Sequence, residues 1–214
     1  MDSNIVVWVD ADEVLVDFKS MFHTYLNEKY NLSLPLGYHA ANWNYGCLFD
    51  DPKDFAAAFE GLPFNWPLKL KAIEGAKEFI NQLKSLGCKV VVITHLPPEK
   101  APDRLENFTN NDLNFDEIYF SWGRDKCDYA KALLPRYGEA QHLFIDDRAS
   151  NVTGFFEKIP GMLTYAVTLD VPYNIETLIK NKDIPQELLD TSSTSQKEMY
   201  SKIIQKVKQL KRLK

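Results

Sequence analysis

Cysteine is scarce in this sequence, and its placement excludes two kinds of small fold. The chain of 214 residues has three cysteines, Cys47, Cys88 and Cys127. They are odd in number, lie far apart and form no C-x-x-C pair, so they fit neither a disulfide framework nor a zinc site. We therefore expect a protein of the reducing cytosol.

Long hydrophobic runs and internal repeats are also lacking. The first four residues lead into a short apolar strand without a basic region, and no apolar stretch approaches the ~20 residues of a membrane span. No repeat of the kind that marks solenoids is present. We expect a cytoplasmic protein without a membrane partner.

Neither sign of charge dominates the chain as a whole. The formal net charge is −5, which argues against a protein that holds nucleic acid through its overall charge. Residues 197–214 are an exception, since their seven basic residues and one acidic residue give +6 and leave −11 on the rest. With 45% hydrophobic residues, the chain can bury a core without disulfide or metal staples.

Five short apolar runs predict β-strands. Each is too short for a buried helix, as is typical of strands that are covered on both faces. Helical patterns lie between some of them, over residues 76–86, 126–134 and 149–158. The alternation predicts an α/β fold, a Rossmann-like doubly wound parallel sheet. The predicted strands are 5–9, 89–94, 117–121, 142–146 and 163–167.

Two segments depart from this alternation. Residues after the first strand contain a helical pattern over 14–30 and many aromatic residues, which indicates an inserted helical cap whose rings either form its core or face a cleft. The basic C-terminal segment has the apolar spacing of one amphipathic helix. Its apolar stripe could fold back on the domain or pair with a second copy, and its charged face could meet a partner or an anionic surface. The expected boundaries are 1–17 and 74–185 for the core, 18–73 for the cap, 186–196 for a polar linker and 197–214 for the helix.

Polar residues stand where the predicted strands end. In a doubly wound sheet, ligands bind outside the carboxyl ends of the strands, so these side chains are the candidates for chemistry. The carboxylates among them would repel one another without a cation, so a hard divalent ion with oxygen ligands is expected, and Mg²⁺ is the first choice. The candidates are Asp10 and Asp12 after the first strand, Thr94 and His95 after the second, Lys126 beyond the third, and Asp146, Asp147 and Arg148 at the fourth.

The order of these residues resembles that of the haloacid dehalogenase superfamily of aspartate-nucleophile phosphatases, over roughly residues 5 to 170. Four local stretches are similar to the 5′(3′)-deoxyribonucleotidase family: residues 10–18 resemble D-x-D-G-V-L-A-D-F, residues 67–76 resemble the segment from cap to core, residues 124–126 read R-D-K, and residues 143–148 resemble L-L-I-D-D-R. Two positions depart from that pattern. Glu13 replaces a glycine, and His95 replaces a small hydroxyl residue.

The resemblance implies a role for each candidate. Asp10 would be the nucleophile that forms an aspartyl-phosphate, and Asp12 the general acid and base. Mg²⁺ would be held by the carboxylates of Asp10 and Asp146 and the carbonyl of Asp12. Asp147 would contact the metal through water or support the residues that bind it. Thr94, His95 and Lys126 would bind the phosphate oxygens. Phe18 would stack on a base, Phe59 and Trp43 are looser candidates for the same task, and Arg148 would reach the substrate.

Each of these residues also has an ordinary structural explanation. Lys126 could be a solvated lysine at a helix start, Thr94 a helix cap, and His95 part of a turn. The expected function is removal of phosphate from deoxyribonucleoside monophosphates. The alternatives are a polynucleotide 3′-phosphatase that uses the basic tail, another small-phosphoester phosphatase, and a non-catalytic scaffold. A homodimer is also open.

Overall fold

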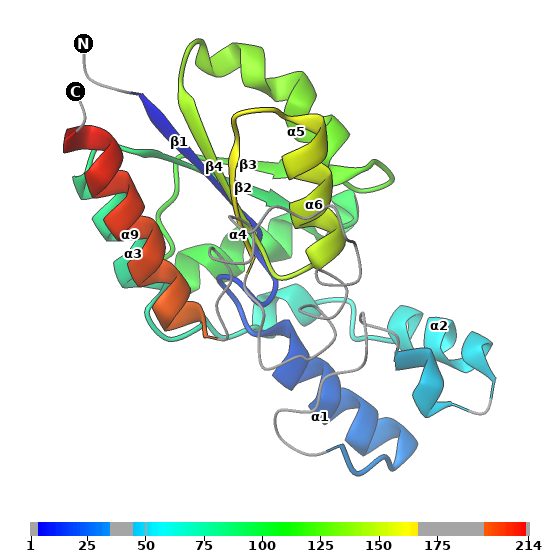
Figure 1. The fold of residues 1–214 in the computed structure, drawn as a ribbon. Coiled ribbons are helices and arrows are strands. Elements are labelled where there is room, and N and C mark those ends of the chain that lie inside the picture. Colours follow the sequence, from blue (N-terminus) through cyan, green and yellow to red (C-terminus); the bar gives the residue numbers. More distant parts are fainter. Residues whose placement is uncertain (1–3, 35–44, 50, 167–194, 213–214) are drawn as a thin grey trace.

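The centre of the molecule is a parallel sheet of five strands in the order β3-β2-β1-β4-β5 (Figure 1). The computed structural model describes residues 4–34, 45–49, 51–166 and 195–212. Its strands confirm the predicted α/β class, a doubly wound parallel sheet, and β1 lies in the middle of it. The strands are β1 (Ile5–Val9), β2 (Lys89–Thr94), β3 (Glu117–Phe120), β4 (Gln141–Asp146) and β5 (Leu163–Ala166).

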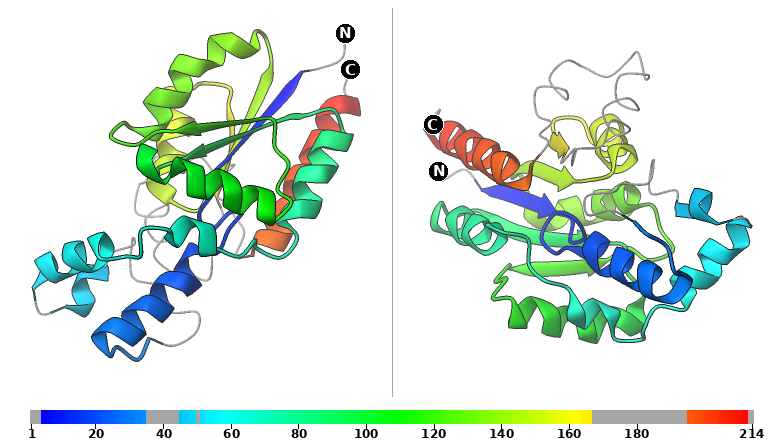
Figure 2. Two further views of the ribbon diagram at one scale, coloured as in Figure 1. Left: turned by 180° about the vertical axis from the view of Figure 1, so that it is seen from behind. Right: turned by 90° about the horizontal axis from the view of Figure 1, so that it is seen from below.

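Helices cover both faces of the sheet (Figure 2). Along β1, Val7 and Val9 belong to an apolar cluster with α3, α4 and α9, whereas Val6 and Trp8 belong to a second cluster with α5 and α6. Alternate residues of a strand point to opposite faces, so a strand that is apolar throughout is buried on both. The helices are α3 (Ala76–Ser85), α4 (Ala101–Asn110), α5 (Lys126–Leu133), α6 (Ala149–Lys158) and α9 (Gln196–Arg212).

Two features differ from the sequence expectations. The helix expected over 14–30 begins only at Phe18, as α1 (Phe18–Tyr30), because residues 11–16 fold into a tight loop and Asp17 caps the helix by accepting from the Ser20 N–H at 2.9 Å. Helix α4 is not among the predicted helices. It begins next to Pro102, which suits the first turn of a helix because a proline lacks an N–H.

The predicted cap region, residues 18–73, contains α1, α2 (Pro52–Glu60) and the 3-10 helices 45–48 and 66–69. The chain enters and leaves this region along adjacent paths. The Asp17 N–H donates to the Lys71 carbonyl and the Ile73 N–H to the Leu15 carbonyl, both at 2.9 Å. The two ends of the predicted cap region therefore lie side by side, next to the end of β1.

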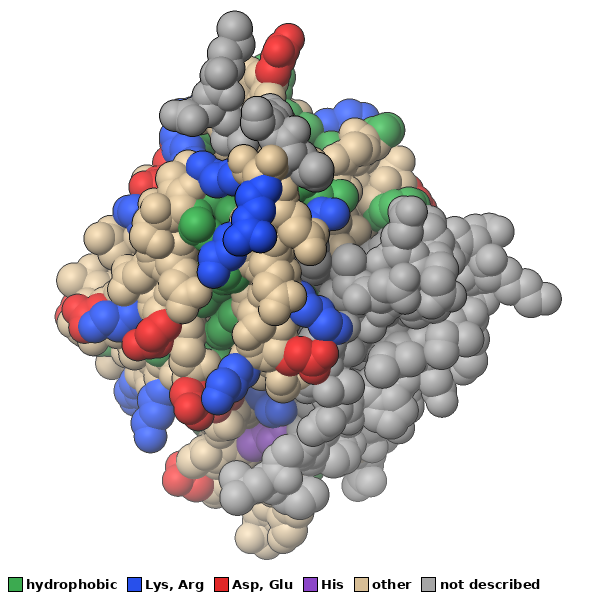
Figure 3. Space-filling model, turned by 60° about the vertical axis from the view of Figure 1, so that its left-hand side comes forward, with side chains coloured by type: hydrophobic (Ala, Val, Ile, Leu, Met, Phe, Trp, Pro, Cys, Tyr) green, Lys and Arg blue, Asp and Glu red, His purple; other side chains and the backbone are tan. Residues whose placement is uncertain are grey.

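The C-terminal helix α9 lies against α3 (Figure 1). Met199, Tyr200, Ile203 and Val207 are buried in the same cluster as β1, so the apolar stripe folds back on the domain. Lysine and arginine side chains gather on this side of the molecule (Figure 3). The predicted linker falls mostly outside the described residues, as does the predicted core segment 167–185. In the described part of the chain, no helix is long and apolar enough to cross a membrane.

Candidate active site

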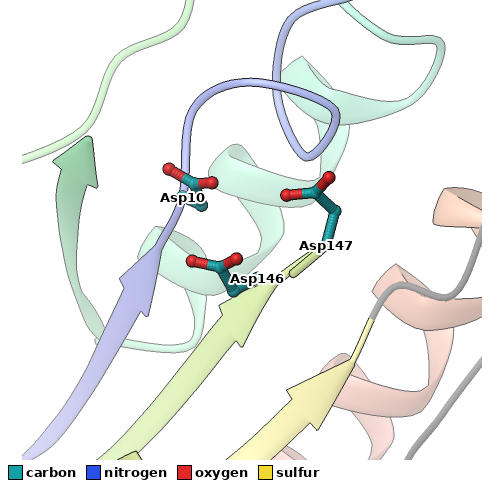
Figure 4. A group of neighbouring side chains, drawn as sticks. All are labelled: Asp10, Asp146 and Asp147. Atoms are coloured by element: carbon teal, nitrogen blue, oxygen red, sulfur yellow. The ribbon is translucent and has the colours of Figure 1, made fainter. Parts of the chain in front are cut away.

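Three buried aspartates meet at the carboxyl end of the sheet (Figure 4). Asp10 follows β1, Asp146 ends β4, and Asp147 comes directly after it. One carboxylate oxygen from each lies within 4.8 Å of the others. The neighbouring strands β1 and β4 run parallel, with Val9 paired to Ile145, so the residues that follow arrive at the same edge. These carboxylates could hold a hard divalent cation.

Lys126 bridges two of the three carboxylates. Its Nζ lies 2.8 Å from Asp10 Oδ1 and 2.8 Å from Asp146 Oδ2. Burial alone lowers the pKa of the lysine, but the two carboxylates outweigh this effect and raise that pKa above its usual range. Lys126 is therefore a buried ammonium ion at the start of α5, and not a solvated helix-start lysine.

The electrostatics of the aspartates reflect their burial. Burial raises the pKa of Asp10 to about 7, against the opposing effect of Lys126. Burial, together with the charges of Asp146 and Asp10, raises the pKa of Asp147 well above its usual range. Carboxylates with raised pKa values in a buried group gain most from a cation that offsets their mutual repulsion.

Asp146 has a partner that sequence reasoning missed. Asn151 Nδ2, in the first turn of α6, donates to both carboxylate oxygens of Asp146 at 3.0 Å. The Arg148 N–H also donates to Asp146 Oδ1, at 2.8 Å. These contacts hold the carboxylate in one orientation. A signal was available, since Asn151 follows Asp146 by five residues at the start of a predicted helix.

Asp12 is held by a second missed residue, Arg104 of α4. Arg104 Nη2 donates to Asp12 Oδ1 at 2.7 Å, and the arginine side chain is fully buried. The guanidinium also lies over the rings of Trp66 and Phe108, at 5.5 and 5.6 Å. The carboxylate of Asp12 is thus paired with a buried guanidinium, and it lines the same cavity as Asp10. Its expected contact with a metal is through the backbone carbonyl, which this placement leaves unaltered.

The loop between Asp10 and α1 explains how a glutamate fits at position 13, where the family that the sequence resembles has a glycine. Glu13 has φ +60°, in the left-handed region where a glycine has no steric cost. Its side chain is buried, its Oε1 accepts from the Lys19 N–H at 2.6 Å, and burial raises its pKa to about 8. The Leu15 and Val16 N–H groups both donate to the Ala11 carbonyl, which closes the loop. Glutamate therefore occupies a glycine-type position through contacts that glycine could not make.

The two candidates after β2 differ in exposure. Thr94 is fully buried, and its Oγ1 has no hydrogen-bond partner among the described residues. Such an orphaned hydroxyl at a strand end suits an oxygen ligand. His95 is exposed, although part of its ring is removed from water. This partial burial lowers the pKa of the ring, as do the charges of Lys126 and Arg148, and the lowered pKa favours the neutral imidazole. Its Nδ1 lies 3.5 Å from Ser121 Oγ.

A cavity of about 230 Å³ lies beside these groups. Of the predicted site residues, Thr94 and Asp146 do not line it, and Trp43 falls outside the described residues. Phe18 and Phe59 lie on the cap side, with ring centroids 6.2 Å apart. The cavity brings together the predicted residues Asp10, Asp12, Phe18, Phe59, His95, Lys126, Asp147 and Arg148, and adds Phe22, Tyr45, Phe55, Trp122 and Asn151.

Comparisons with known proteins identify the fold of the chain. No protein-family model and no curated protein sequence matches the chain. Solved structures do match it. A HAD family hydrolase from Deinococcus radiodurans R1, with bound phosphate and sodium, is 18% identical with a TM-score of 0.58, and the match covers 93% of this chain and 94% of that one.

Two further structures match over similar lengths. A phosphonoacetaldehyde hydrolase-like protein from Oleispira antarctica is 15% identical, with a TM-score of 0.58 and coverage of 97% and 93%. A haloacid dehalogenase-like hydrolase from Streptococcus pneumoniae is 14% identical, with a TM-score of 0.58 and coverage of 94% and 98%. At these identities the likeness concerns the fold. The chain therefore has the fold of the haloacid dehalogenase superfamily hydrolases, as the order of its motifs predicts.

Proposed function

We propose that the chain is a Mg²⁺-dependent phosphomonoesterase that works through an aspartyl-phosphate on Asp10. The observation that carries the proposal is the buried group at the end of β1 and β4. There, three carboxylates lie within 4.8 Å of one another and a buried lysine contacts two of them. A group of this kind suits a divalent cation and a phosphate dianion together, because each offsets the charge of the other.

The residues present fit the metal. Asp10 and Asp146 would hold it with carboxylate oxygens, Asp12 with its backbone carbonyl, and Asp147 lies close enough to take part. When bound, Mg²⁺ supplies positive charge next to the phosphoryl oxygens and orients the phosphate for in-line attack. Asn151 and Lys126 keep the Asp146 carboxylate in place for this task.

The chain's own residues then provide the chemistry. An Asp10 carboxylate oxygen attacks phosphorus, the bond from phosphorus to the ester oxygen breaks, and Asp12 donates its proton to the leaving alkoxide. The resulting Asp12 carboxylate takes a proton from the water that cleaves the aspartyl-phosphate, which restores both residues. Lys126 binds a non-bridging oxygen and reduces repulsion between the phosphate and the aspartates. Thr94 and His95 are the further candidates for binding the phosphate.

Deoxyribonucleoside monophosphates are the proposed substrates. The cavity beside Asp10 is lined by several aromatic rings, among them Phe18 and Phe59. Stacking of a base on such rings is worth about 1–3 kcal/mol and tolerates every base. This selects nucleotides over sugar phosphates without strong preference for one base. Arg148 lines the same cavity and would contact the substrate.

The test is inorganic phosphate release, with and without Mg²⁺, from deoxy- and ribonucleoside monophosphates, sugar phosphates and a 3′-phosphorylated oligonucleotide. Asp10→Asn is expected to abolish release. Asp112→Asn makes the same chemical change at an exposed residue that pairs with Lys77, so it should retain full activity.

The panel also separates the rival functions. Release from deoxynucleotides that requires Mg²⁺ and Asp10 supports the nucleotidase. Release confined to the oligonucleotide would replace it with a polynucleotide 3′-phosphatase. Absence of release from every ester, by a protein that is folded by circular dichroism, would contradict a phosphatase of this class and favour the scaffold.

A further inference from the structure

Exposed aromatic side chains gather at the mouth of the site. Among the described residues, four large hydrophobic side chains are exposed: Phe59, Phe64, Leu105 and Trp122. Three of these four line one cavity of about 630 Å³, which adjoins the smaller cavity beside Asp10. Single exposed apolar residues are ordinary, but a group of them in a hollow next to reactive side chains marks a place where a ligand binds.

Trp122 belongs to the core and not to the cap. It lies between β3 and α5, four residues before Lys126, and 48% of it is exposed. The loop is anchored on both sides, because the Ser121 N–H donates to the Thr94 carbonyl and the Arg124 N–H to the Ser121 carbonyl, both at 2.9 Å. One short, fixed loop therefore carries both the lysine beside the phosphate site and an exposed indole.

His95 supports the Trp122 ring. The two ring centroids are 4.9 Å apart with an interplanar angle of 41°, and both residues line both cavities. Phe59 lines the same two cavities from the cap side. The space in front of the phosphate site is therefore walled by rings from two separate parts of the chain.

We propose that Trp122, supported by His95, is the core-side stacking surface for a planar aromatic leaving group, with Phe59 as its cap-side counterpart. This inference rests on the proposed function and adds to it a residue that determines specificity: a ring on the same loop as Lys126 that selects phosphate esters of nucleosides. Stacking on an indole requires only the flat face of the base, so the surface discriminates aromatic from non-aromatic alcohols and accepts every base.

The test compares one nucleotide with one ring-free ester. kcat/KM is measured with Mg²⁺ for deoxyadenosine monophosphate and for glycerol 2-phosphate, and the ratio of the two is the readout. Trp122→Ala should lower this ratio about 10- to 100-fold, mainly through KM for the nucleotide. Trp122→Phe keeps a ring and should recover most of the ratio. Leu105→Ala, at an exposed residue that lines neither cavity, should leave it unchanged.

Binding without turnover distinguishes this inference from the proposed function. In Asp10→Asn, titration with deoxyadenosine monophosphate should quench tryptophan fluorescence, and Trp122→Phe in the same background should remove most of the quenching. Quenching by Trp122 in a protein that hydrolyses no ester would uphold the stacking surface and overturn the phosphatase. An unchanged ratio in Trp122→Ala, or an equal fall in kcat/KM for both esters, would overturn the stacking surface. Phosphate release from either ester would still uphold the phosphatase in that case.

Discussion

Lys126 is the residue on which the balance of charge in the site depends. It is the buried cation that contacts both Asp10 and Asp146, at 2.8 Å each. Removal of one member of a buried ion pair leaves a buried charge without compensation, which costs about 3–5 kcal/mol. We expect Lys126→Met to lower the free energy of unfolding in urea by that amount at pH 8 in EDTA. Mg²⁺ should recover part of the loss, since it replaces the missing positive charge.

Lys158→Met is the matched control for this prediction. Lys158 pairs with Asp125 and Asp128 on the surface, at 3.3 and 3.1 Å, and 41% of its side chain is exposed. Exposed pairs contribute at most about 1 kcal/mol. Equal losses of unfolding free energy in the two variants, or a Lys126→Met protein as stable as the wild type in EDTA, would contradict the prediction. Either result would show that the contacts of Lys126 with Asp10 and Asp146 do not stabilise the fold.

For single residues, the sequence predicts the position of side chains that follow strands far better than the position of side chains that reach the site from helices. Asp10 and Asp146 could be placed because an apolar run fixes where a strand ends, and parallel strands end at one edge. Arg104 could not be placed, because its contact with Asp12 depends on how α4 packs across the sheet. A buried arginine has no signature in the sequence that separates it from an exposed one.

The loop of residues 11–16 shows how one element depends on another far along the chain. Its apolar residues Val14, Leu15 and Val16 follow a helical pattern, which explains why the sequence predicted helix from residue 14. In the loop, the backbone of Glu13 instead has left-handed dihedral angles, with φ +60°. This conformation costs about 1–3 kcal/mol and persists only where neighbouring residues hold it. Two side chains of α9 do so: Gln196 Nε2 donates to the Glu13 carbonyl at 3.1 Å, and the Tyr200 hydroxyl donates to the Val14 carbonyl.

Tyr200→Phe tests this support. The tyrosine ring stacks on Phe79, with centroids 4.3 Å apart, and phenylalanine preserves that packing while leaving the buried Val14 carbonyl without its donor. Loss of one partner from a buried hydrogen bond costs about 1–3 kcal/mol. We expect urea unfolding to show a loss in this range, and kcat for phosphate release to fall more than KM changes, because the loop carries Asp12.

Ser201→Ala is the control on the same helix, since Ser201 is exposed and its hydroxyl donates to the Lys197 carbonyl of that helix, at 3.0 Å. A Tyr200→Phe protein that matches this control in both stability and kcat would refute the support by α9.

The packing of α9 also bears on any test of the basic tail by deletion. Deletion of residues 197–214 would not isolate a role of the basic side chains, because it would also expose the core and remove the buried residues Met199, Ile203 and Val207.

At the scale of the whole molecule, the site exists only when distant segments have assembled. β1, β4 and α5 supply the charged groups, α4 holds Asp12, and the cap supplies rings to the same cavity. A ligand that binds this assembly and not the unfolded chain stabilises the fold by RT ln(1 + [L]/Kd), about 2.7 kcal/mol at a hundredfold excess over Kd. For a chain of this length, each kcal/mol raises Tm by about 2–4 °C.

Beryllium fluoride, which mimics a phosphoryl group bound to a carboxylate, makes this linkage a test that requires no knowledge of the substrate. With Mg²⁺ present, we expect it to raise Tm by about 5–10 °C at a hundredfold excess over its Kd, because it would bind the Asp10 carboxylate and place its negative charge next to the cation and Lys126. Differential scanning fluorimetry measures the shift. Asp10→Asn should abolish it and Asp112→Asn should retain it, whereas an equal shift in Asp10→Asn would mean that the anion binds elsewhere and that Asp10 is not the acceptor of the phosphoryl group.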